Sequence, residues 1–381
     1  MRITIFGLSI TSSWANGHAS TFRSLVHGLT TLGHDVAFLE RDLPDHAANR
    51  DLPEPRYARI HVYSSLTAAK KKFAREVRDA DLVIVGSCVP EGVALGEWVT
   101  ESARGTTAFY DLDTPITLAK LERRDHDYIS RRLIPRYNLY LSLTGGPTLR
   151  RIERRYGAPV ARALYGSVDT EHYFPETAKQ KFDLGYMGSY AADRQPLLDE
   201  FLLEPAHRWT CSRMIVAGAK YPAHVGWPPN VKHIEHIPAD EHRTFYCTQR
   251  FTLNLTRHEM RVAGFSASAR LFEAAACGTP VISDEWEGLE TFFRVGTEIL
   301  TTRSAERTLE YLREIPEEDR LAIGARARDR VIKEHTAIHR ARQLEKYASE
   351  VLGRKQRLVA DTAPPSRVAA ASGRAAHRAG A

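Results

Sequence analysis

The chain has 381 residues, of which 43% are hydrophobic and 26% are charged. This is the composition of an ordinary globular protein, and the length exceeds one usual core, so we expect two domains. The formal net charge is +6, and the segment after residue 353, with six basic residues and one acid, carries +5 of it. The remaining body is nearly neutral, and we expect no nucleic-acid partner.

No apolar run approaches the length of a membrane-spanning helix, so no span is predicted. The first ten residues lack the basic flank and cleavage site of a signal peptide. The four cysteines lie far apart and form no C-x-x-C pair: Cys88, Cys211, Cys247 and Cys277. We therefore expect reduced thiols in a cytoplasmic protein without a structural zinc site.

The first half of the chain alternates predicted strands and helices. An apolar strand at 3–7 is followed by a polar loop at 8–20 and a helix that ends at Gly33. Further strands are predicted at 35–40, 81–87, 106–113 and 140–145. This alternation predicts a doubly wound, parallel α/β domain over residues 1–165.

A second series follows a break, predicted as a hinge, at residues 166–179. Its strands are predicted at 182–188, 213–219, 231–237, 250–256 and 280–284, within a second α/β domain at 180–335. A closing helix is expected at 336–356, packing back toward the first domain. A basic, alanine-rich tail at 357–381 has the composition of a disordered segment. Ligands of such folds bind at the carboxyl ends of the strands, so both domains should face one cleft.

Two segments of the first domain supply candidate residues for that cleft. The loop SSWANGHAS contains Asn16, Gly17 and His18 just before a helix, where backbone N–H groups can approach an anion or a hydroxyl-rich ligand. His18 is a candidate general base or hydrogen-bond donor, and a locally satisfied helix-start histidine is the alternative. Asp111 and Asp113 end a predicted strand, where they could contact ligand, bind a metal or shape a turn. The glycine pattern of dinucleotide-binding proteins is missing, which argues against an NAD enzyme.

The stretch GFSASARLFEAAACGTPVISD of the second domain combines cations, hydroxyls and an acid. Arg257 precedes a loop with Ser266 and Ser268, and Arg270 lies near the start of the next helix. Basic side chains and free N–H groups at a helix start suit a diphosphate. Glu273, farther along the same helix, can accept hydrogen bonds from a ribose diol, and a helix-start acid that only balances the dipole is the alternative.

A family resemblance rests on several of these segments together. LFEAAACGTPVISD and the following EGLE resemble the E-A-x-A-x-G-x-P-V-I motif of GT-B glycosyltransferases. YGSVDTEHYFP is similar to their hinge, YMGSYAADRQ to the opening of their donor domain, and EHTAIHRARQLEKY to their closing helix. LNLTRHEM and SARLFEAAACG most resemble the spore-maturation-protein-like branch of the retaining, nucleotide-sugar-dependent enzymes.

The resemblance implies a GT-B fold of two Rossmann-like domains and a set of donor-binding residues. Those are Gly188, Arg194, Lys220, Arg257, Ser266, Ser268, Arg270, Glu273 and Glu287. The chain departs from the family at two places. The first acid of the family's Glu pair is Phe265 here, with Glu259 or Glu287 as possible substitutes, and an arginine of the family's phosphate site is Ser189. The phosphate charge would then be met by Arg194, Lys220, Arg257 or Arg270.

The resemblance further implies a glycosyltransferase that uses no metal and no cofactor beyond a nucleotide-sugar co-substrate. We expect a UDP- or dTDP-linked donor, retention of anomeric configuration, and a hydroxyl acceptor on a glycan, lipid, natural product or protein. His18, Asp113 and Glu273 are the catalytic candidates, and in an inverting enzyme His18 or Asp113 would be the base. A non-catalytic nucleotide-sugar-binding protein is the second hypothesis, and an NAD-dependent enzyme or sugar epimerase is the third.

Overall fold

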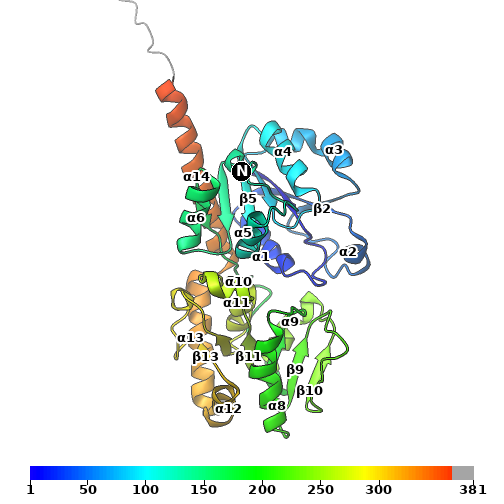
Figure 1. Ribbon diagram of the computed structural model, residues 1–381, viewed down its shortest axis with the longest axis vertical. Helices are drawn as coiled ribbons and strands as arrows, with labels where there is room; N and C mark the ends of the chain where they lie inside the picture. Colours follow the sequence, from blue (N-terminus) through cyan, green and yellow to red (C-terminus); the bar gives the residue numbers. More distant parts are fainter. Residues whose placement is uncertain (363–381) are drawn as a thin grey trace, which may run out of the picture.

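The computed structural model describes residues 1–362 and contains two parallel sheets, one above the other in Figure 1. The upper sheet has seven strands in the order β3-β2-β1-β4-β5-β6-β7. They are β1 (Arg2–Gly7), β2 (Asp35–Arg41), β3 (Arg59–Tyr63), β4 (Leu82–Gly86), β5 (Thr106–Asp111), β6 (Leu139–Ser142) and β7 (Ala161–Ala163).

The lower sheet has six strands in the order β10-β9-β8-β11-β12-β13. They are β8 (Phe182–Met187), β9 (Met214–Ala217), β10 (Val231–Ile234), β11 (Gln249–Asn254), β12 (Val281–Asp284) and β13 (Leu300–Thr302). In both sheets the chain starts near the middle, moves to one edge and then crosses to the other. The predicted class of two Rossmann-like, doubly wound domains is confirmed.

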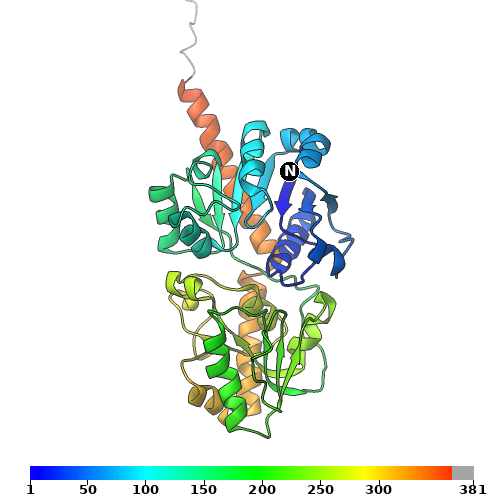
Figure 2. The same ribbon diagram turned by 45° about the vertical axis from the view of Figure 1, so that its right-hand side comes forward.

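Helices cover both faces of each sheet (Figure 2). In the first domain they are α1 (His18–Thr31), α2 (Pro44–Ala48), α3 (Leu66–Asp79), α4 (Gly92–Ser102), α5 (Thr114–Glu122) and α6 (Pro147–Tyr156). The second domain has α7 (Gln195–Leu198), α8 (Glu204–Arg208), α9 (His242–Cys247), α10 (His258–Ala263), α11 (Ala269–Ala276), α12 (Ala305–Glu314) and α13 (Glu317–Glu334). The last helix is α14 (Ala337–Thr362).

Three short strands were not among the predicted elements. β7 and β13 have three residues each, and β3 is an edge strand with one buried residue in five. Such segments lack the continuous apolar run by which a strand buried on both faces is recognised. The strand predicted at 231–237 ends at Ile234, because the chain turns there toward the cleft.

The C-terminal helix belongs to the core of the first domain. Side chains alternate across β1, so that Phe6 packs on one face of the sheet and Ile5 on the other. Leu344 and Ala348 of α14 pack into the cluster on the Ile5 side, next to α1. A methyl group on Gly28 of α1 would lie 2.4 Å from the Ala337 carbonyl oxygen, so only glycine permits this close crossing.

Two chain segments therefore cross between the domains side by side. The segment predicted as the hinge contacts the start of α14, since Val168 accepts a hydrogen bond from the Ala337 N–H (2.8 Å) and donates to the His335 carbonyl (3.1 Å). Next to it, His27 Nδ1 lies 2.6 Å from the Asp169 carboxylate. The hydrogen bond to Asp169 raises the pKa of His27 despite its partial burial.

The helix α14 extends to Thr362 and so runs into the segment predicted to be disordered. The rest of that predicted tail, residues 363–381, lies outside the described residues. Within residues 1–362, no helix combines the length and the apolar character that crossing a bilayer requires.

Candidate functional site

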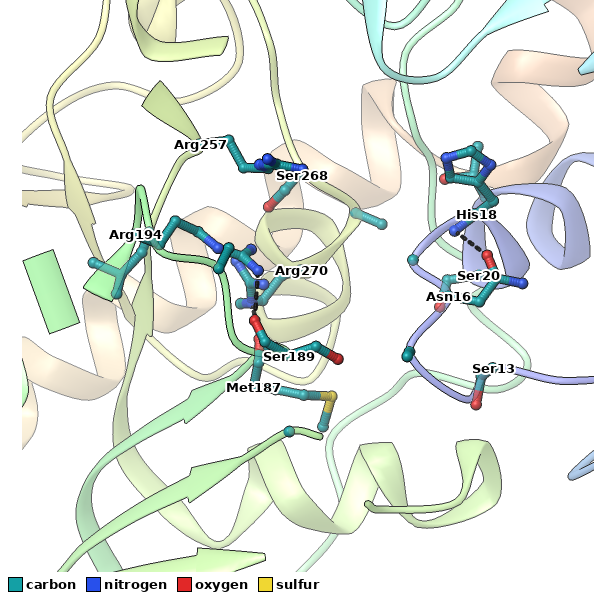
Figure 3. Close-up of a pocket in the computed structure, with 18 of the residues that line it drawn as sticks. Ser13, Asn16, His18, Ser20, Met187, Ser189, Arg194, Arg257, Ser268 and Arg270 are labelled. Carbon is teal, nitrogen blue, oxygen red and sulfur yellow. Dashed lines mark hydrogen bonds between the residues drawn. The ribbon is translucent and has the colours of Figure 1, made fainter. Parts of the chain in front are cut away.

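A cleft of about 530 Å³ separates the two sheets at the carboxyl ends of their strands. Figure 3 shows its two walls, one built by the loop before α1 and the other by the β8–α7 loop and the start of α11. Twelve of the fourteen residues proposed from the sequence line it: Asn16, Gly17, His18, Asp113, Gly188, Arg194, Lys220, Arg257, Ser266, Ser268, Arg270 and Glu273. The other two, Asp111 and Glu287, do not.

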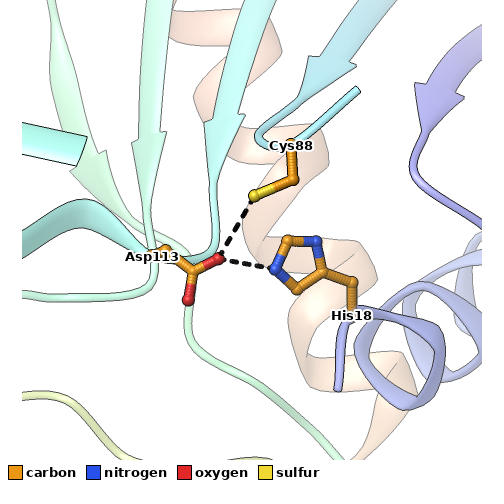
Figure 4. Close-up of side chains that lie close together, drawn as sticks. All are labelled: His18, Cys88 and Asp113. Carbon is orange, nitrogen blue, oxygen red and sulfur yellow. Dashed lines mark hydrogen bonds and ion pairs between the residues drawn. The ribbon is translucent and has the colours of Figure 1, made fainter. Parts of the chain in front are cut away.

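The wall of the first domain centres on His18 and Asp113. His18 Nε2 lies 2.7 Å from Asp113 Oδ2, and the Cys88 thiol lies 3.7 Å from the same oxygen (Figure 4). Burial opposes ionisation of Asp113, but the His18 charge and hydrogen bond outweigh it and lower the pKa of the carboxyl. Burial, with the negative charge of Asp113, raises the pKa of the Cys88 thiol. Asp113 is therefore a carboxylate shared by a histidine and a protonated thiol.

These three side chains are of types that can hold a metal ion. One donor atom from each of His18, Cys88 and Asp113 lies within 4.8 Å of the others, and imidazole, thiolate and carboxylate are all zinc ligands. The 2.7 Å separation of the nitrogen and the oxygen is a hydrogen-bond length, and tetrahedral zinc ligands lie farther apart, at about 3.3 Å for bonds of 2.0 Å. The observed geometry is that of a hydrogen-bonded group.

Asn16 shapes the loop that carries His18. Its side-chain oxygen accepts from the His18 N–H (3.0 Å), and its amide donates to the carbonyls of Ser9 and Ser12. The amide is thereby used inside the loop, which fixes the start of α1. Gly17 lies between Asn16 and His18, and nothing approaches within 4 Å of where its Cβ would be, so it leaves open space beside them.

Asp111, which the sequence analysis predicts on the acceptor side, does not line the cleft. It is fully buried, and its carboxylate accepts from Tyr140 Oη (2.5 Å), Thr117 Oγ1 (2.8 Å) and the Asp113 N–H (3.2 Å). Burial raises the pKa of Asp111 to about 6. The side chain shapes the turn that presents Asp113, which was the turn alternative for this pair.

On the wall of the second domain, Arg270 lies beneath the β8–α7 loop. Its Nε donates to the Met187 carbonyl (2.6 Å) and its Nη1 to Asn254 Oδ1 (2.8 Å), which also accepts from Ser268 Oγ (2.8 Å). A Cβ on Gly188 would lie 3.2 Å from an Arg270 nitrogen, so glycine lets the loop pass close to the guanidinium. Both hydrogen-bond acceptors of Arg270 are neutral oxygens, and its positive charge stays unbalanced within the described residues.

Three more cations lie around Arg270. Arg194 donates to the Ser189 carbonyl (2.6 Å), and its Nε is buried without a hydrogen-bond partner in the described structure. Lys220 is exposed and adopts a left-handed backbone with φ of +68°. Only Arg257 faces an acid, Asp193, at 3.4 Å. Positive charge on this wall therefore exceeds the negative charge that accompanies it.

Glu273 lies in the second turn of α11 with 5% of its surface exposed. Its Oε2 accepts a hydrogen bond from Tyr246 Oη at 3.0 Å. Burial, and then the Glu273 charge, raise the pKa of Tyr246 well above its usual value, so the phenol keeps its proton and donates it. The bond fixes one carboxylate oxygen and leaves the other available to a ligand.

Ser266 differs from the neighbouring Ser268 in its partners, because Ser268 bonds within the second domain and Ser266 contacts the first domain. It lies 2.7 Å from Thr144 Oγ1 of the first domain and donates to the Gly264 carbonyl at 3.0 Å. The residue lines the cleft, yet its side chain connects the two domains at the base of the cleft.

Phe265 stands where the GT-B glycosyltransferases have the first acid of their Glu pair. Phe265 adopts φ of +47°, and Cβ atoms on Gly146 and Gly288 would lie 2.4 and 2.3 Å from its ring carbons. The ring is thus packed between glycines of the two domains. Neither proposed substitute lines the cleft, since Glu259 is absent from its lining and Glu287 is exposed elsewhere. Glu287, predicted as a donor-binding residue, therefore lies outside the lining of the cleft, and its carbonyl accepts from the Phe265 N–H.

The sequence reasoning missed several residues of the site. Cys88 follows β4 at the same sheet edge as Asp113, so the strand-end argument applied to Asp113 would have found it. Tyr246 had no local signal, because α9 meets α11 only in the folded chain. His236 of the cleft lining packs against Trp14 of the first domain, with ring centroids 5.3 Å apart, and this contact likewise needs both domains.

Part of the chain is similar to a family of known proteins. Residues 194–346 match the family model described as "Glycosyl transferase-like". This part of the chain is thus similar to a glycosyltransferase family, and the chain as a whole has a GT-B fold. The predicted GT-B fold is confirmed, and the match over residues 194–346 supports the prediction of a glycosyltransferase. The spore-maturation-protein-like branch stays a prediction, and no curated protein sequence matches the chain significantly.

Solved GT-B structures match nearly the whole chain. Sucrose-phosphate synthase from Thermosynechococcus elongatus is 12% identical, with a TM-score of 0.69 over 93% of this chain and 100% of its own. HepE from Anabaena, in complex with UDP and glucose, is 13% identical, with a TM-score of 0.67 over 92% and 100%. An alpha-glucosyltransferase in complex with UDP is 13% identical, with a TM-score of 0.69 over the same shares. At these identities the matches show the fold alone.

Proposed function

We propose that the protein transfers a sugar from a nucleoside diphosphate sugar to a hydroxyl acceptor. The observation that carries the proposal is the unbalanced positive charge of Arg270 and Arg194, whose side chains donate only to neutral oxygens within the described residues. Burying such charge without an anion is unfavourable, and a diphosphate supplies two phosphate groups for guanidinium donors. Glu273, one helical turn away on α11, is placed to accept from a ribose diol.

We further propose UDP-glucose, or a close UDP-sugar, as the donor. Two of the structural neighbours were solved with UDP, one of them together with glucose. A dTDP-sugar is the alternative, because the pairing edge of thymine matches that of uracil. The donor would lie against the second domain, with its diphosphate at Arg194, Arg257, Lys220 and Arg270, near the hydroxyl of Ser268.

For the chemistry, we propose retention of anomeric configuration without a metal ion. The arginines would stabilise the charge that develops on the departing diphosphate, the role that a divalent cation has in other transferases. The acceptor oxygen bonds to the anomeric carbon on the face that the diphosphate leaves, and its proton passes to the leaving phosphate oxygen. His18 supports this route, because its Nε2 bonds Asp113 and its Nδ1, which has no hydrogen-bond partner in the described structure, is buried, so neither nitrogen is presented to an acceptor hydroxyl.

The acceptor hydroxyl would enter from the first domain, beside Asn16, Gly17 and His18. In this proposal Asp113 positions the imidazole and accepts a hydrogen bond from the acceptor. The lowered pKa of Asp113 keeps it ionised at neutral pH, which suits a hydrogen-bond acceptor better than a base. An inverting enzyme would instead need the His18 ring to turn and expose a nitrogen to the cleft.

The test is transfer of labelled glucose from UDP-glucose, with the anomeric configuration of the product read by NMR. Slow hydrolysis of the donor to free glucose serves when no acceptor is at hand, and the first-formed anomer then reports the stereochemistry. A β-anomer from UDP-α-glucose would refute retention. A protein that binds UDP but neither transfers nor hydrolyses would be the non-catalytic binding protein, a candidate favoured by Phe265 at the place of the missing acid.

A further inference from the structure

A second cluster of positive charge lies on the first domain, outside the cleft. Residues 122–155 contain nine arginines, four acids and no lysine, and so carry +5. Residues 1–353 together carry +1, which leaves −4 for the remainder of that range. All nine arginines are exposed: Arg123, Arg124, Arg131, Arg132, Arg136, Arg150, Arg151, Arg154 and Arg155. The positive charge of the body is thus concentrated in residues 122–155, and the rest of the body is acidic.

The acids in this range are already paired. Glu122 contacts Arg151 and Arg155, while Asp125 and Asp127 both contact Lys120. The fourth, Glu153, lies 3.8 Å from the Arg162 guanidinium and accepts from the Ala161 N–H.

Six arginines of the face are consequently left without a carboxylate within 4 Å among the described residues. They are Arg123, Arg124, Arg131, Arg132, Arg150 and Arg154. Unpaired like charges in one place repel each other, and the repulsion falls when an anion binds there.

Part of this cluster lines a hollow of its own. Arg124, Arg131 and Arg132 surround it at the end of α5, and the rest of its lining is Leu121, Glu122, His126 and Ser130. The Glu122 carboxylate is paired with Arg151 and Arg155. Arg131 is held over the Tyr156 ring, with its guanidinium carbon 5.0 Å from the ring centroid. We name this hollow the arginine pocket. Its donors are guanidinium forks and a hydroxyl, which match the oxygens of a phosphate group in two-point contacts.

The side chains around the arginine pocket indicate which class of phosphate-bearing ligand fits it best. The tyrosines at 128, 137 and 140 are all buried, so residues 122–155 offer one exposed ring, that of His126, whereas binding of single strands uses several rings on which successive bases stack. No large apolar side chain of the same range is exposed for insertion into a bilayer. The observations therefore favour a soluble, phosphate-bearing ligand over a nucleic acid or a membrane.

The pocket is also joined to the reaction cleft by one helix. α5 starts directly after Asp113 and ends at Glu122, next to the pocket. Its nine residues span about 13 Å. Figure 1 shows α5 and α6 together on the first domain, the side assigned to the acceptor. A ligand bound at the pocket can thus extend one helix length to the acceptor wall.

We propose that the arginine pocket binds a phosphate group of the acceptor substrate, so that the acceptor is a phosphate-bearing molecule. This rests on the proposed transferase function. The probe is inorganic triphosphate, measured by titration calorimetry in the presence of excess UDP, which occupies the cleft arginines. Wild-type protein should bind triphosphate with a Kd below about 1 mM. The combined change Arg124→Gln, Arg131→Gln and Arg132→Gln should weaken binding at least tenfold.

The matched control removes the same charge from α3, at exposed positions of the same domain: Lys70→Gln, Lys71→Gln and Arg75→Gln. It should change binding less than twofold. Equal loss in both variants would mean an effect of net charge only and would overturn the proposal, as would failure of wild-type protein to bind. Lysine at the three arginine positions should restore only part of the affinity, since it keeps charge but loses the forks.

Three further arms distinguish the sources of phosphate. The acceptor assignment would be overturned if the same arginines bound another phosphate source more tightly than triphosphate. The two sources tested are vesicles of phosphatidylglycerol and phosphatidylcholine in equal parts, and mixed-sequence single-stranded DNA. Phosphorylated oligosaccharides long enough to span the length of α5 should receive labelled glucose with a KM that the pocket variant raises, while the same oligosaccharides without phosphate should not show this rise. Stabilisation by UDP should be equal in wild type and pocket variant. Its absence from both would refute the transferase function alone, because the difference in triphosphate binding between the pocket variant and the α3 control does not depend on UDP.

Discussion

The change Glu273→Gln tests whether the buried carboxylate of α11 holds the ribose of the donor. Glutamine has nearly the same volume, and its amide oxygen can still accept from Tyr246, so the fold should be kept. What is lost is a charged acceptor for two ribose hydroxyls. Hydrogen bonds to charged groups contribute about 1.5–3 kcal/mol. We therefore expect UDP binding to weaken by about 2 kcal/mol, or about 30-fold.

Thermal melting converts this loss into a measurable shift. At a UDP concentration 100 times the wild-type Kd, binding stabilises the folded state by about 2.7 kcal/mol. A 30-fold weaker variant has only about three times its own Kd of ligand and gains about 0.9 kcal/mol. For domains of this size 1 kcal/mol moves Tm by about 2–4 °C. Wild type should thus shift by about 5–10 °C and Glu273→Gln by about 2–3 °C.

The control is Glu287→Gln, the exposed carboxylate that lies outside the cleft. It should keep the full wild-type shift. The reasoning is refuted if Glu273→Gln, folded and with normal Tm without ligand, keeps that shift too. A wild-type protein that none of UDP, dTDP, GDP or ADP stabilises would contradict the whole donor assignment.

Three other predictions address the hinge, the α1–α14 contact and the acceptor wall. His27→Gln should lower the free energy of unfolding more at pH 6 than at pH 8.5, because the contact with Asp169 raises the pKa of His27 in the folded protein; its stabilisation is full below the unfolded pKa and is lost as pH rises through the folded one. Gly28→Ala should cost about 1–3 kcal/mol in urea denaturation through overpacking, whereas Gly226→Ala, which meets open space, should be nearly neutral. Asp113→Asn should reduce transfer at least tenfold while the UDP melting shift stays unchanged, because Asp113 acts on the acceptor side.

Each of these has an outcome that would contradict it. A stability loss for His27→Gln that is constant with pH would mean that the ion pair with Asp169 contributes nothing. Equal stability of the two glycine variants would show that α14 can move away from α1 without cost. If Asp113→Asn abolished the UDP shift, the carboxylate would belong to the donor site or to the fold, and its proposed role would be wrong.

The local pattern of the sequence determined the fold class and most of the cleft. Buried parallel strands are continuous apolar runs, so the sequence reveals where they end. The residues that follow such strands meet at one edge of the sheet, and this rule alone predicts that Asp113 and the 264–273 stretch lie at the cleft. The same rule applies to Cys88. Arg270 and Glu273 were found because a helix start next to polar side chains has few structural explanations.

Only the tertiary structure decided what each polar group does with its hydrogen bonds. Asp111 and Asp113 are two residues apart in one motif, yet one is fully buried against Tyr140 and the other faces the cleft with His18. The bond from Tyr246 to Glu273 joins helices distant in sequence. The burial and hydrogen bonding of a side chain depend on several chain segments at once. The sequence pattern can therefore identify candidate residues, but their roles depend on how those segments pack.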